Sequence, residues 1–347
     1  MNFFAKAHTT LTAYASVLTL GACATLIAAP AAAQETFTWK VQSHYPSSSS
    51  SYIDSLGRLE RILEERTDGR LQIELYPAGV LFSGKETFNA VSRGILDMGS
   101  ILPAYAQDKI SLAGIASGLP FAFRTPSEAA YFHKNLGFEQ MLRDEAAKYG
   151  VYWATDRVYA TEMVVSKPIK NWDDFTSLKI RSSGTLQKFL TEAGAAASYF
   201  PGSELYSALD SGVVDGAHWG AAQSADSMGL YEVAKYHVKP SLNIASGTII
   251  VSQKSLNKLP EDMQGIVKTV LDEHFWFRTN EYQYKDRLAL AKVIAEKGVQ
   301  VNVLPDEVLN KMAPAAQKIW DEEGARSDNA KKALDMLKEQ LVKLGYL

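Results

Sequence analysis

Polar and apolar residues alternate in two early segments of the chain, 37–42 and 71–76, and this period of two is typical of β-strands. Between them, apolar residues recur at helical spacing over 53–63, which predicts an amphipathic helix. A second helix is predicted over 86–93 and a short strand over 98–102. This alternation of strands and helices predicts an α/β sheet built from βαβ units.

The same alternation returns in the second half of the chain. Strands are predicted at 151–154, 160–166, 178–181, 213–219 and 248–251, and helices at 185–193 and 204–211. No stretch rich in proline and glycine divides the chain into two sequential domains. Two lobes would therefore be joined by several crossings of the chain, an arrangement that suits hinge closure over a ligand.

Residues 262–297 carry a nearly unbroken helical pattern. At 1.5 Å per residue such a helix is about 54 Å long. That length exceeds the width of one small domain, so the helix is expected to cross both lobes. Pro305 and Asp306 then begin a final helical region.

The N-terminal segment, residues 1–33, has the pattern of a cleavable signal peptide. Lys6 is its only charged residue, a run rich in Ala, Leu, Val and Thr follows from 11 to 29, and Ala31–Ala33 supplies the small residues of a cleavage site. A lipoprotein anchored through Cys23 is the alternative interpretation. No later segment approaches the length of a membrane span, so we expect an exported, soluble protein.

Composition narrows the function classes. The chain has 347 residues, 46% of them hydrophobic and 22% charged, with a formal charge of −3, which is ordinary for a folded globular protein. A near-neutral balance argues against a nucleic-acid partner, and a single cysteine excludes an intrachain disulfide. We find no phosphate-binding loop, zinc-protease helix or nucleophile elbow, so an enzyme is not expected.

Arg181 is the candidate binding residue that position alone indicates. It ends the strand predicted at 178–181 and precedes a Ser-Ser-Gly turn and a helix N-terminus. Open α/β sheets bind ligands at the carboxyl ends of their strands, where free N–H groups of helices favour anions. A guanidinium there offers a fork that matches a carboxylate. The alternative is a structural arginine that caps the sheet edge.

Other candidates also follow predicted strands. Trp219 suits either the core or an apolar wall of a ligand site, and Tyr45 and Tyr105 could donate hydroxyl hydrogen bonds. If residues 154–166 form one strand, Arg157 and Glu162 lie five residues apart on opposite faces of it, so at most one of them faces a given cleft.

The chain resembles the solute-binding proteins of TRAP transporters, the tripartite ATP-independent periplasmic uptake systems. The matching motifs, in order, are Gly69-Arg70-Leu71 with Tyr76-Pro77-Ala78-Gly79-Val80-Leu81, Gly94-Ile95-Leu96-Asp97-Met98, Leu119-Pro120-Phe121-Ala122-Phe123, Leu178-Lys179-Ile180-Arg181, Glu204-Leu205-Tyr206-Ser207-Ala208-Leu209 and Gly212-Val213-Val214-Asp215-Gly216. They cover essentially the whole chain after the leader. The resemblance implies a two-lobed periplasmic-binding-protein-like α/β fold with a hinge, crossing strands and one long helix spanning both lobes. The expected division is 34–155 with 246–262, 156–245 with 298–347, and a spanning helix at 263–297.

The resemblance also implies roles for individual residues. Arg181 matches the arginine that clamps the ligand carboxylate, Arg157 lies near a second arginine of other members, and the segment around Trp219 looks like the branch that binds 2-oxo and other small monocarboxylates. In that branch the residues corresponding to Glu162, His218 and Trp219 approach the ligand or a bridging metal ion. This chain has His218 and Asn243 where acids are common, so we expect no cofactor, with Glu162 and Trp219 as the candidates if a metal ion bridges the ligand. Glu162, His218 and Asn243 are all expected to contact the ligand.

The expected function is capture of a small organic carboxylate and its delivery to TRAP membrane permease subunits. Two alternatives remain at this point: an exported hydrolase or lyase that uses the same cleft, and a receptor subunit that senses the ligand.

Overall fold

A nine-stranded sheet forms the centre of the protein in the computed structural model, which describes residues 35–347. The predicted signal peptide, with Cys23, lies outside the described residues. The strand order is β2-β1-β3-β8-β4-β7-β5-β6, with β9 paired to β8. The strands are β1 (Phe37–Gln42), β2 (Leu71–Tyr76), β3 (Met98–Ile101), β4 (Val151–Val165), β5 (Lys179–Arg181), β6 (Ala196–Ser198), β7 (Gly216–His218), β8 (Tyr236–Ser252) and β9 (Gln300–Val303).

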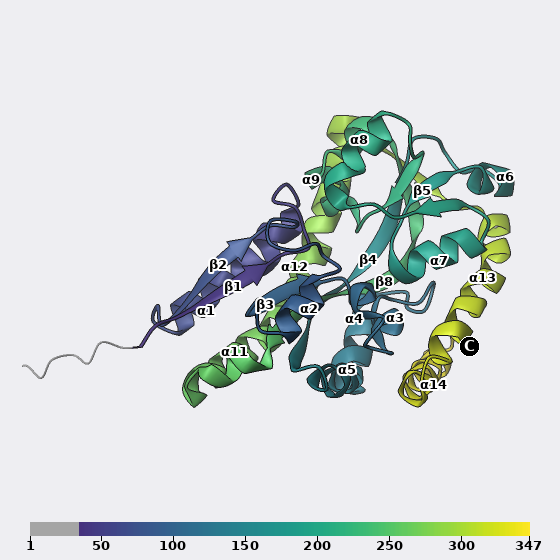
Figure 1. The fold of residues 1–347 in the computed structure, drawn as a ribbon. Coiled ribbons are helices and arrows are strands. Elements are labelled where there is room, and N and C mark those ends of the chain that lie inside the picture. The colour runs from purple at the N-terminus through teal and green to yellow at the C-terminus, as the bar shows by residue number, and fades with distance from the viewer. Residues whose placement is uncertain (1–34) are drawn as a thin grey trace, which may run out of the picture. The chain divides into compact units, whose positions relative to one another are not determined.

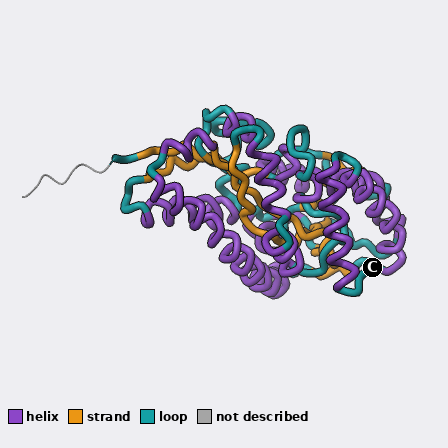
Figure 2. The backbone as a smooth tube through the Cα atoms, turned by 90° about the horizontal axis from the view of Figure 1, so that it is seen from below, coloured by secondary structure: helices purple, strands orange, loops and turns teal. Residues whose placement is uncertain are grey.

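Helices cover both sides of these strands, as the tube view shows (Figure 2). They are η1 (Tyr52–Gly57), α1 (Arg58–Arg66), α2 (Thr87–Ser92), η2 (Pro103–Ala106), α3 (Ala113–Ala116), α4 (Pro126–Ala130), η3 (Tyr131–Asn135), α5 (Phe138–Ala147), α6 (Trp172–Thr176), α7 (Gly184–Glu192), η4 (Gly202–Glu204), α8 (Leu205–Asp210), α9 (Ala222–Ser227), α10 (Leu230–Val233), α11 (Gln253–Lys258), α12 (Glu261–Lys297), α13 (Asp306–Gly324) and α14 (Asp328–Lys343). The predicted α/β class is confirmed. No helix among residues 35–347 is long and apolar enough to cross a membrane.

Two long antiparallel strands, β4 and β8, connect the two ends of the sheet. The sequence pattern divided β4 into two strands, and this prediction was wrong because one 15-residue strand runs through both segments. It also detected only the last part of β8, which has 17 residues. Both strands are buried on both faces over most of their length, so their residues do not alternate between polar and apolar.

The pairing of β4 with β8 is interrupted twice by register shifts, between Thr155 and Arg157 and between Thr161 and Met163. A β-bulge locally bends a strand and redirects the side chains beside it. The bulged segments carry Asp156, Arg157 and Glu162. These are the charged side chains in the middle of an otherwise apolar strand, so the bulges decide where each charge points.

Helix α12 confirms the prediction of one long helix that spans the fold. Figure 1 shows it passing from the side of α11 to the side of α8 and α9. Along its length it contributes to separate apolar clusters: Met263 packs with β1, α1 and β2, whereas Val293 packs with α8 and α10. Tyr282, between them, packs against Tyr159 of β4. One helix is therefore shared by the cores at both ends of the sheet.

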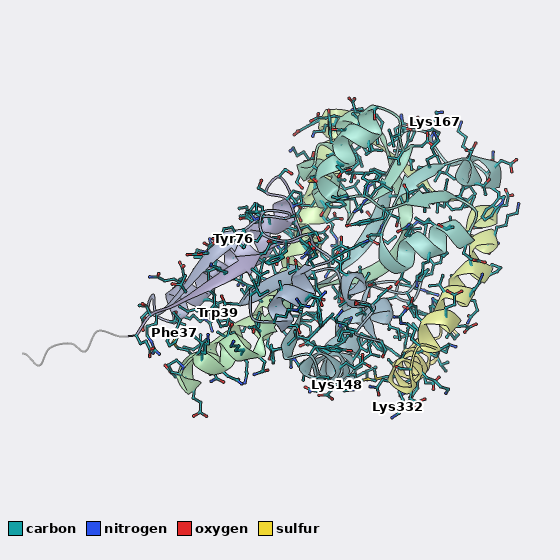
Figure 3. The ribbon with its side chains drawn as sticks, viewed as in Figure 1. Phe37, Trp39, Tyr76, Lys148, Lys167 and Lys332 are labelled. Atoms are coloured by element: carbon teal, nitrogen blue, oxygen red, sulfur yellow. The ribbon has the colours of Figure 1, made fainter. Side chains whose placement is uncertain are left out.

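Figure 3 shows the positions of exposed lysine side chains and of aromatic side chains of the sheet. Lys148, Lys167 and Lys332 are exposed and lie at the margins of the view. Trp39 of β1 is buried against α1 and α12. The lysines thus remain in water, and the buried cations described below are arginines, whose guanidinium groups are more weakly hydrated.

We predict that position 118 requires glycine, because Gly118 has a φ of +87° and a Cβ there would lie 2.4 Å from the carbonyl oxygen of Ile244. Gly118→Ala should lower the free energy of unfolding by about 3 kcal/mol, from left-handed strain and overpacking together. Gly137 is the matched control, since its φ of +89° is similar but no atom lies within 4 Å of its Cβ position. Gly137→Ala should lose only about 1 kcal/mol. Urea denaturation checks both, and equal losses would contradict the close packing.

Candidate functional site

A cavity of about 360 Å³ is lined by residues from both halves of the sheet, and its volume is in the range of small-molecule sites. Its walls come from segments far apart in the sequence, including the loop after β1, η2, the middle of β4, the end of β5 and the end of β7. Six predicted residues line it: Tyr45, Tyr105, Arg157, Arg181, His218 and Trp219. None of the described residues that line it is an aspartate or a glutamate.

Arg181 is the most distinctive side chain of this cavity, because it is 3% exposed and its hydrogen bonds go to neutral acceptors. Its Nε and Nη2 donate to the carbonyl oxygen of Phe200 at 3.2 and 3.1 Å, and Nη1 donates to that of His218 at 3.3 Å. Within residues 35–347 no carboxylate forms a salt bridge with it. A guanidinium has five N–H donors, so these three bonds leave donors on Nη1 and Nη2 for a ligand.

The positive charge of Arg181 is therefore buried without a counter-ion in the described protein. Burial lowers the pKa of its guanidinium, partly opposed by Tyr105 and Tyr199, yet an arginine remains protonated in proteins. Carbonyl dipoles orient such a charge but do not neutralise it, and a buried unpaired charge is costly. An anion that entered the cavity would remove this cost.

Local sequence explains the position of Arg181. Strand β5 ends at this residue, and α7 begins three residues later, at Gly184, which has a φ of +59°. Gly184 and Thr185, at the start of α7, line the same cavity, so the positive end of the helix dipole lies beside the guanidinium. Both features favour an anion at this end of the sheet.

Aromatic rings enclose the guanidinium. The Arg181 Cζ lies 4.8 Å from the ring centroid of Trp219 and 5.6 Å from that of Tyr199. The Trp219 ring sits so close to Gly202 that a Cβ there would approach it to 2.3 Å, so this turn needs a glycine. Across the cavity, the hydroxyl oxygens of Tyr105 and Tyr199 lie 3.3 Å apart. The rings exclude water from one side of the charge.

His218 is a neutral polar group of the cavity. Burial, followed by the nearby charge of Arg181, lowers the pKa of its imidazole to about 3. Its Nδ1 lies 3.1 Å from Ser182 Oγ, and its Nε2 has no hydrogen-bond partner in the described part of the chain. With Nδ1 accepting the Ser182 proton, Nε2–H becomes a donor free to bind a ligand oxygen.

Arg157 lines the cavity but differs from Arg181 in its partners. Its Nη1 forms a salt bridge with its neighbour Asp156, and Nη2 donates to Tyr45 Oη at 3.0 Å and Ser51 Oγ at 3.1 Å. Arg157 thus orients the Tyr45 hydroxyl while its own charge is compensated.

Glu162 and Asn243 are buried behind the cavity and do not line it. Glu162 forms a salt bridge with Lys239, its Oε2 lies 2.6 Å from His237 Nε2, and its Oε1 accepts a hydrogen bond from Ser241. Asn243 Nδ2 donates to the carbonyl oxygens of Ser117 and Gly118. Arg157 lines the cavity and Glu162 does not. Register shifts lie beside both residues, so their spacing along a regular strand does not by itself account for this difference.

A bridging metal ion does not fit this arrangement. Hard cations take several oxygen ligands, including carboxylates, and no cluster of three His, Cys, Asp or Glu side chains suited to a metal occurs among residues 35–347. Glu162, a predicted metal candidate, already has the Lys239 ammonium as its cation. The other candidate, Trp219, has no anionic group.

Among the lining residues that sequence reasoning missed are one histidine and two tyrosines, His44, Tyr159 and Tyr199. His44 and Tyr199 follow the ends of β1 and β6, which is the same positional signal that indicated Tyr45 and Tyr105. Burial and Arg157 lower the pKa of His44 to about 3, so this imidazole is also neutral. Tyr159 lies in β4 and had no such signal, because the bulge that turns this part of the strand is not visible in the sequence.

Comparisons with known proteins give one family. Residues 42–327 match the family model of bacterial extracellular solute-binding proteins, family 7. A monocarboxylate 2-oxoacid-binding periplasmic protein of Nostoc sp. is 26% identical over 312 residues, covering 84% of this chain and 80% of that protein. A C4-dicarboxylate-binding periplasmic protein of Rhodobacter capsulatus is 27% identical, covering 62% of this chain and 65% of that protein.

A solved structure shares the fold. The TRAP transporter solute-binding protein from Bordetella bronchiseptica superposes with a TM-score of 0.81 at 26% identity, covering 90% of this chain and 94% of that one. That protein was crystallised with copurified calcium and picolinate in one site of a mixed-occupancy dimer. The two-lobed fold expected from the sequence is confirmed by this similarity.

We predict that calcium does not bind this chain's cavity, because its lining offers no carboxylate and Glu162 is paired with Lys239. Adding millimolar calcium chloride should leave the melting temperature of the apo protein unchanged within about 1 °C, since only a ligand of the folded state raises it. Differential scanning calorimetry, with EDTA as the reference, makes the measurement. A calcium-dependent rise that EDTA reverses would show that the cavity recruits a metal ion.

Proposed function

The chain belongs to family 7 of the bacterial extracellular solute-binding proteins, and from this premise we propose that its cavity captures a small organic carboxylate. The captured acid is delivered to the permease subunits of a TRAP transporter in the membrane. The protein acts in the periplasm after removal of residues 1–33, and it binds its ligand without converting it.

The observation that carries this proposal is the buried charge of Arg181, which has no carboxylate partner in the described residues. A ligand carboxylate would accept the remaining N–H donors of Arg181 in a bidentate geometry. His218 Nε2–H and the start of α7 supply further donors on the same side. Trp219 and the tyrosine rings would contact the apolar part of the acid.

The division into lobes is part of the proposal. One lobe comprises 34–155 and 246–262, the other comprises 156–245 and 298–347, and 263–297 spans both. Tyr45 and Tyr105 then belong to the first lobe, whereas Arg181 and Trp219 belong to the second. A ligand that contacts both pairs would stabilise the closed form, because it gains the full set of contacts only there.

Replacing Arg181 tests the carboxylate clamp. Arg181→Ala should weaken binding of the acid by about 2–5 kcal/mol, because the ligand anion loses its partner in a dry cavity. Arg181→Lys should recover only part of this loss, since an ammonium keeps the charge but not the two-pronged geometry. Isothermal titration calorimetry measures the three affinities, which should fall in the order wild type, Arg181→Lys, Arg181→Ala.

The ligand for this titration is found by native mass spectrometry of protein purified without refolding, with pyruvate and picolinate as the starting probes. Circular dichroism controls for folding. Binding by folded Arg181→Ala as tight as that of the wild type would make Arg181 a structural cap of β5 and reject the site.

Lobe closure is tested by small-angle X-ray scattering. The radius of gyration of the wild type should fall when the acid saturates the protein, because the ligand favours the closed form. Arg181→Ala at the same ligand concentration is the control, and its radius should stay at the apo value. A wild-type radius that does not respond to saturating ligand would rule out closure.

A further inference from the structure

The number of negative charges that the cavity accepts can be inferred from the two arginines that line it. This inference rests on the proposed function, that is, on a carboxylate ligand at Arg181. The relatives leave the number open, because one binds monocarboxylate 2-oxoacids and another binds C4-dicarboxylates. Two buried guanidinium groups at first suggest a site for a dianion.

The charge of the second guanidinium is already compensated within the protein, although its Nε has no hydrogen-bond partner among the described residues. Arg157 forms its salt bridge with the adjacent carboxylate of Asp156, and both groups are buried, with side-chain exposures of 1% and 3%. Both terminal nitrogens of Arg157 have protein partners, since Nη2 binds the hydroxyl oxygens of Tyr45 and Ser51. The pair therefore contributes no net charge to the cavity.

Asp156 is held in its ionised form. Burial alone would raise the pKa of its carboxyl group, but the charge of Arg157 and the hydrogen bond from His274 outweigh burial and hold it below its ordinary value. Oδ1 accepts hydrogen bonds from Ser55 Oγ at 2.6 Å and His274 Nε2 at 2.7 Å. These partners come from η1 and α12, so two helices fix the carboxylate beside Arg157.

The other polar groups of the cavity add little charge. His44 and His218 are neutral at physiological pH, because burial lowers the pKa of each to about 3. Burial also raises the pKa of Tyr105 and Tyr159, which keeps both hydroxyls protonated. Lys85 lines the rim but is exposed, so water screens its charge.

We propose that Asp156 is a specificity-determining residue, which cancels the charge of Arg157 and so restricts the cavity to ligands with one negative charge. Arg181 satisfies one carboxylate. A second carboxylate in the same cavity would find no buried cation left to pair with it. A buried charge without a partner is strongly disfavoured. The cavity therefore selects monoanionic acids over dianions of the same shape.

Pairs of probes that differ by one charge test the wild type. Malonate, succinate and glutarate are each compared with their monoamides at pH 8, where the diacids are dianions and the monoamides are monoanions of nearly equal size. The monoamide should bind at least about tenfold more tightly in every pair that binds. Tighter or equal binding of the diacid would overturn the inference and leave the carboxylate function intact. If no diacid, monoamide, pyruvate, picolinate or copurified acid binds, the proposed function fails and the inference fails with it.

Charge variants then test the residue itself. Asp156→Asn uncovers the charge of Arg157 while keeping the side-chain shape, and it should move the diacid-to-monoamide affinity ratio toward the diacid by at least about tenfold. The double variant Asp156→Asn/Arg157→Gln removes both charges and should return the ratio to the wild-type value. An unchanged ratio in folded Asp156→Asn would overturn the role of Asp156.

Glu281→Gln is the matched control, because Glu281 pairs with Arg278 and Lys285 of α12 and does not line the cavity. It removes one negative charge without uncovering Arg157, so its affinity ratio should equal that of the wild type. If this variant shifts the ratio as much as Asp156→Asn does, general electrostatics and not the Asp156–Arg157 pair sets the selectivity. Should Asp156→Asn fail to fold, the wild-type probe pairs still decide the inference, because tighter or equal binding of the diacid overturns it.

Discussion

The candidate site depends on one buried guanidinium that is oriented by the backbone and not neutralised by it. The Phe200 carbonyl oxygen holds one edge of Arg181 and the His218 carbonyl oxygen holds another, so the group is fixed before any ligand arrives. Those carbonyls belong to the loop after β6 and to the end of β7, the two strands that flank β5 in the sheet. Burying the unpaired charge of Arg181 lowers the stability of the fold. An anion that pairs with Arg181 would remove this cost and would therefore bind more tightly.

The charged side chains of β4 lie beside its two bulges and have different partners. Asp156 and Arg157 fall at the first register shift and neutralise each other at the cavity wall, whereas Glu162 falls at the second and is neutralised by Lys239 behind it. An unbulged strand of this length would place charges at regular intervals on its faces. Each of the two carboxylates of β4 has its own internal cation, whereas Arg181 lines the cavity without a carboxylate partner among residues 35–347.

The same elements connect the two ends of the sheet, as the proposed closure requires. Strand β4 and helix α12 contribute to the apolar clusters at both ends of the sheet, and β8 pairs with β4 along most of its length. The two ends are therefore connected by continuous secondary structure and not by a flexible linker. Asp156 is held by Ser55 and His274, which ties the spanning helix to the wall of the cavity. A connection of this kind permits hinge bending while it preserves the geometry of the binding groups.

The sequence by itself determined the α/β class, the early strands, the long helix and the position of Arg181, because each depends on local periodicity or on the end of one strand. It also placed Tyr45, Tyr105 and Trp219 after strands whose ends meet. Only the tertiary structure decided that β4 is one bulged strand, that Glu162 and Asn243 lie behind the cavity, and that Arg157 is paired while Arg181 is not. These outcomes depend on register shifts and on partners distant in the sequence, such as Lys239 for Glu162. Local pattern carries no information about such contacts, because the energy of a buried charge is set by what surrounds it in space.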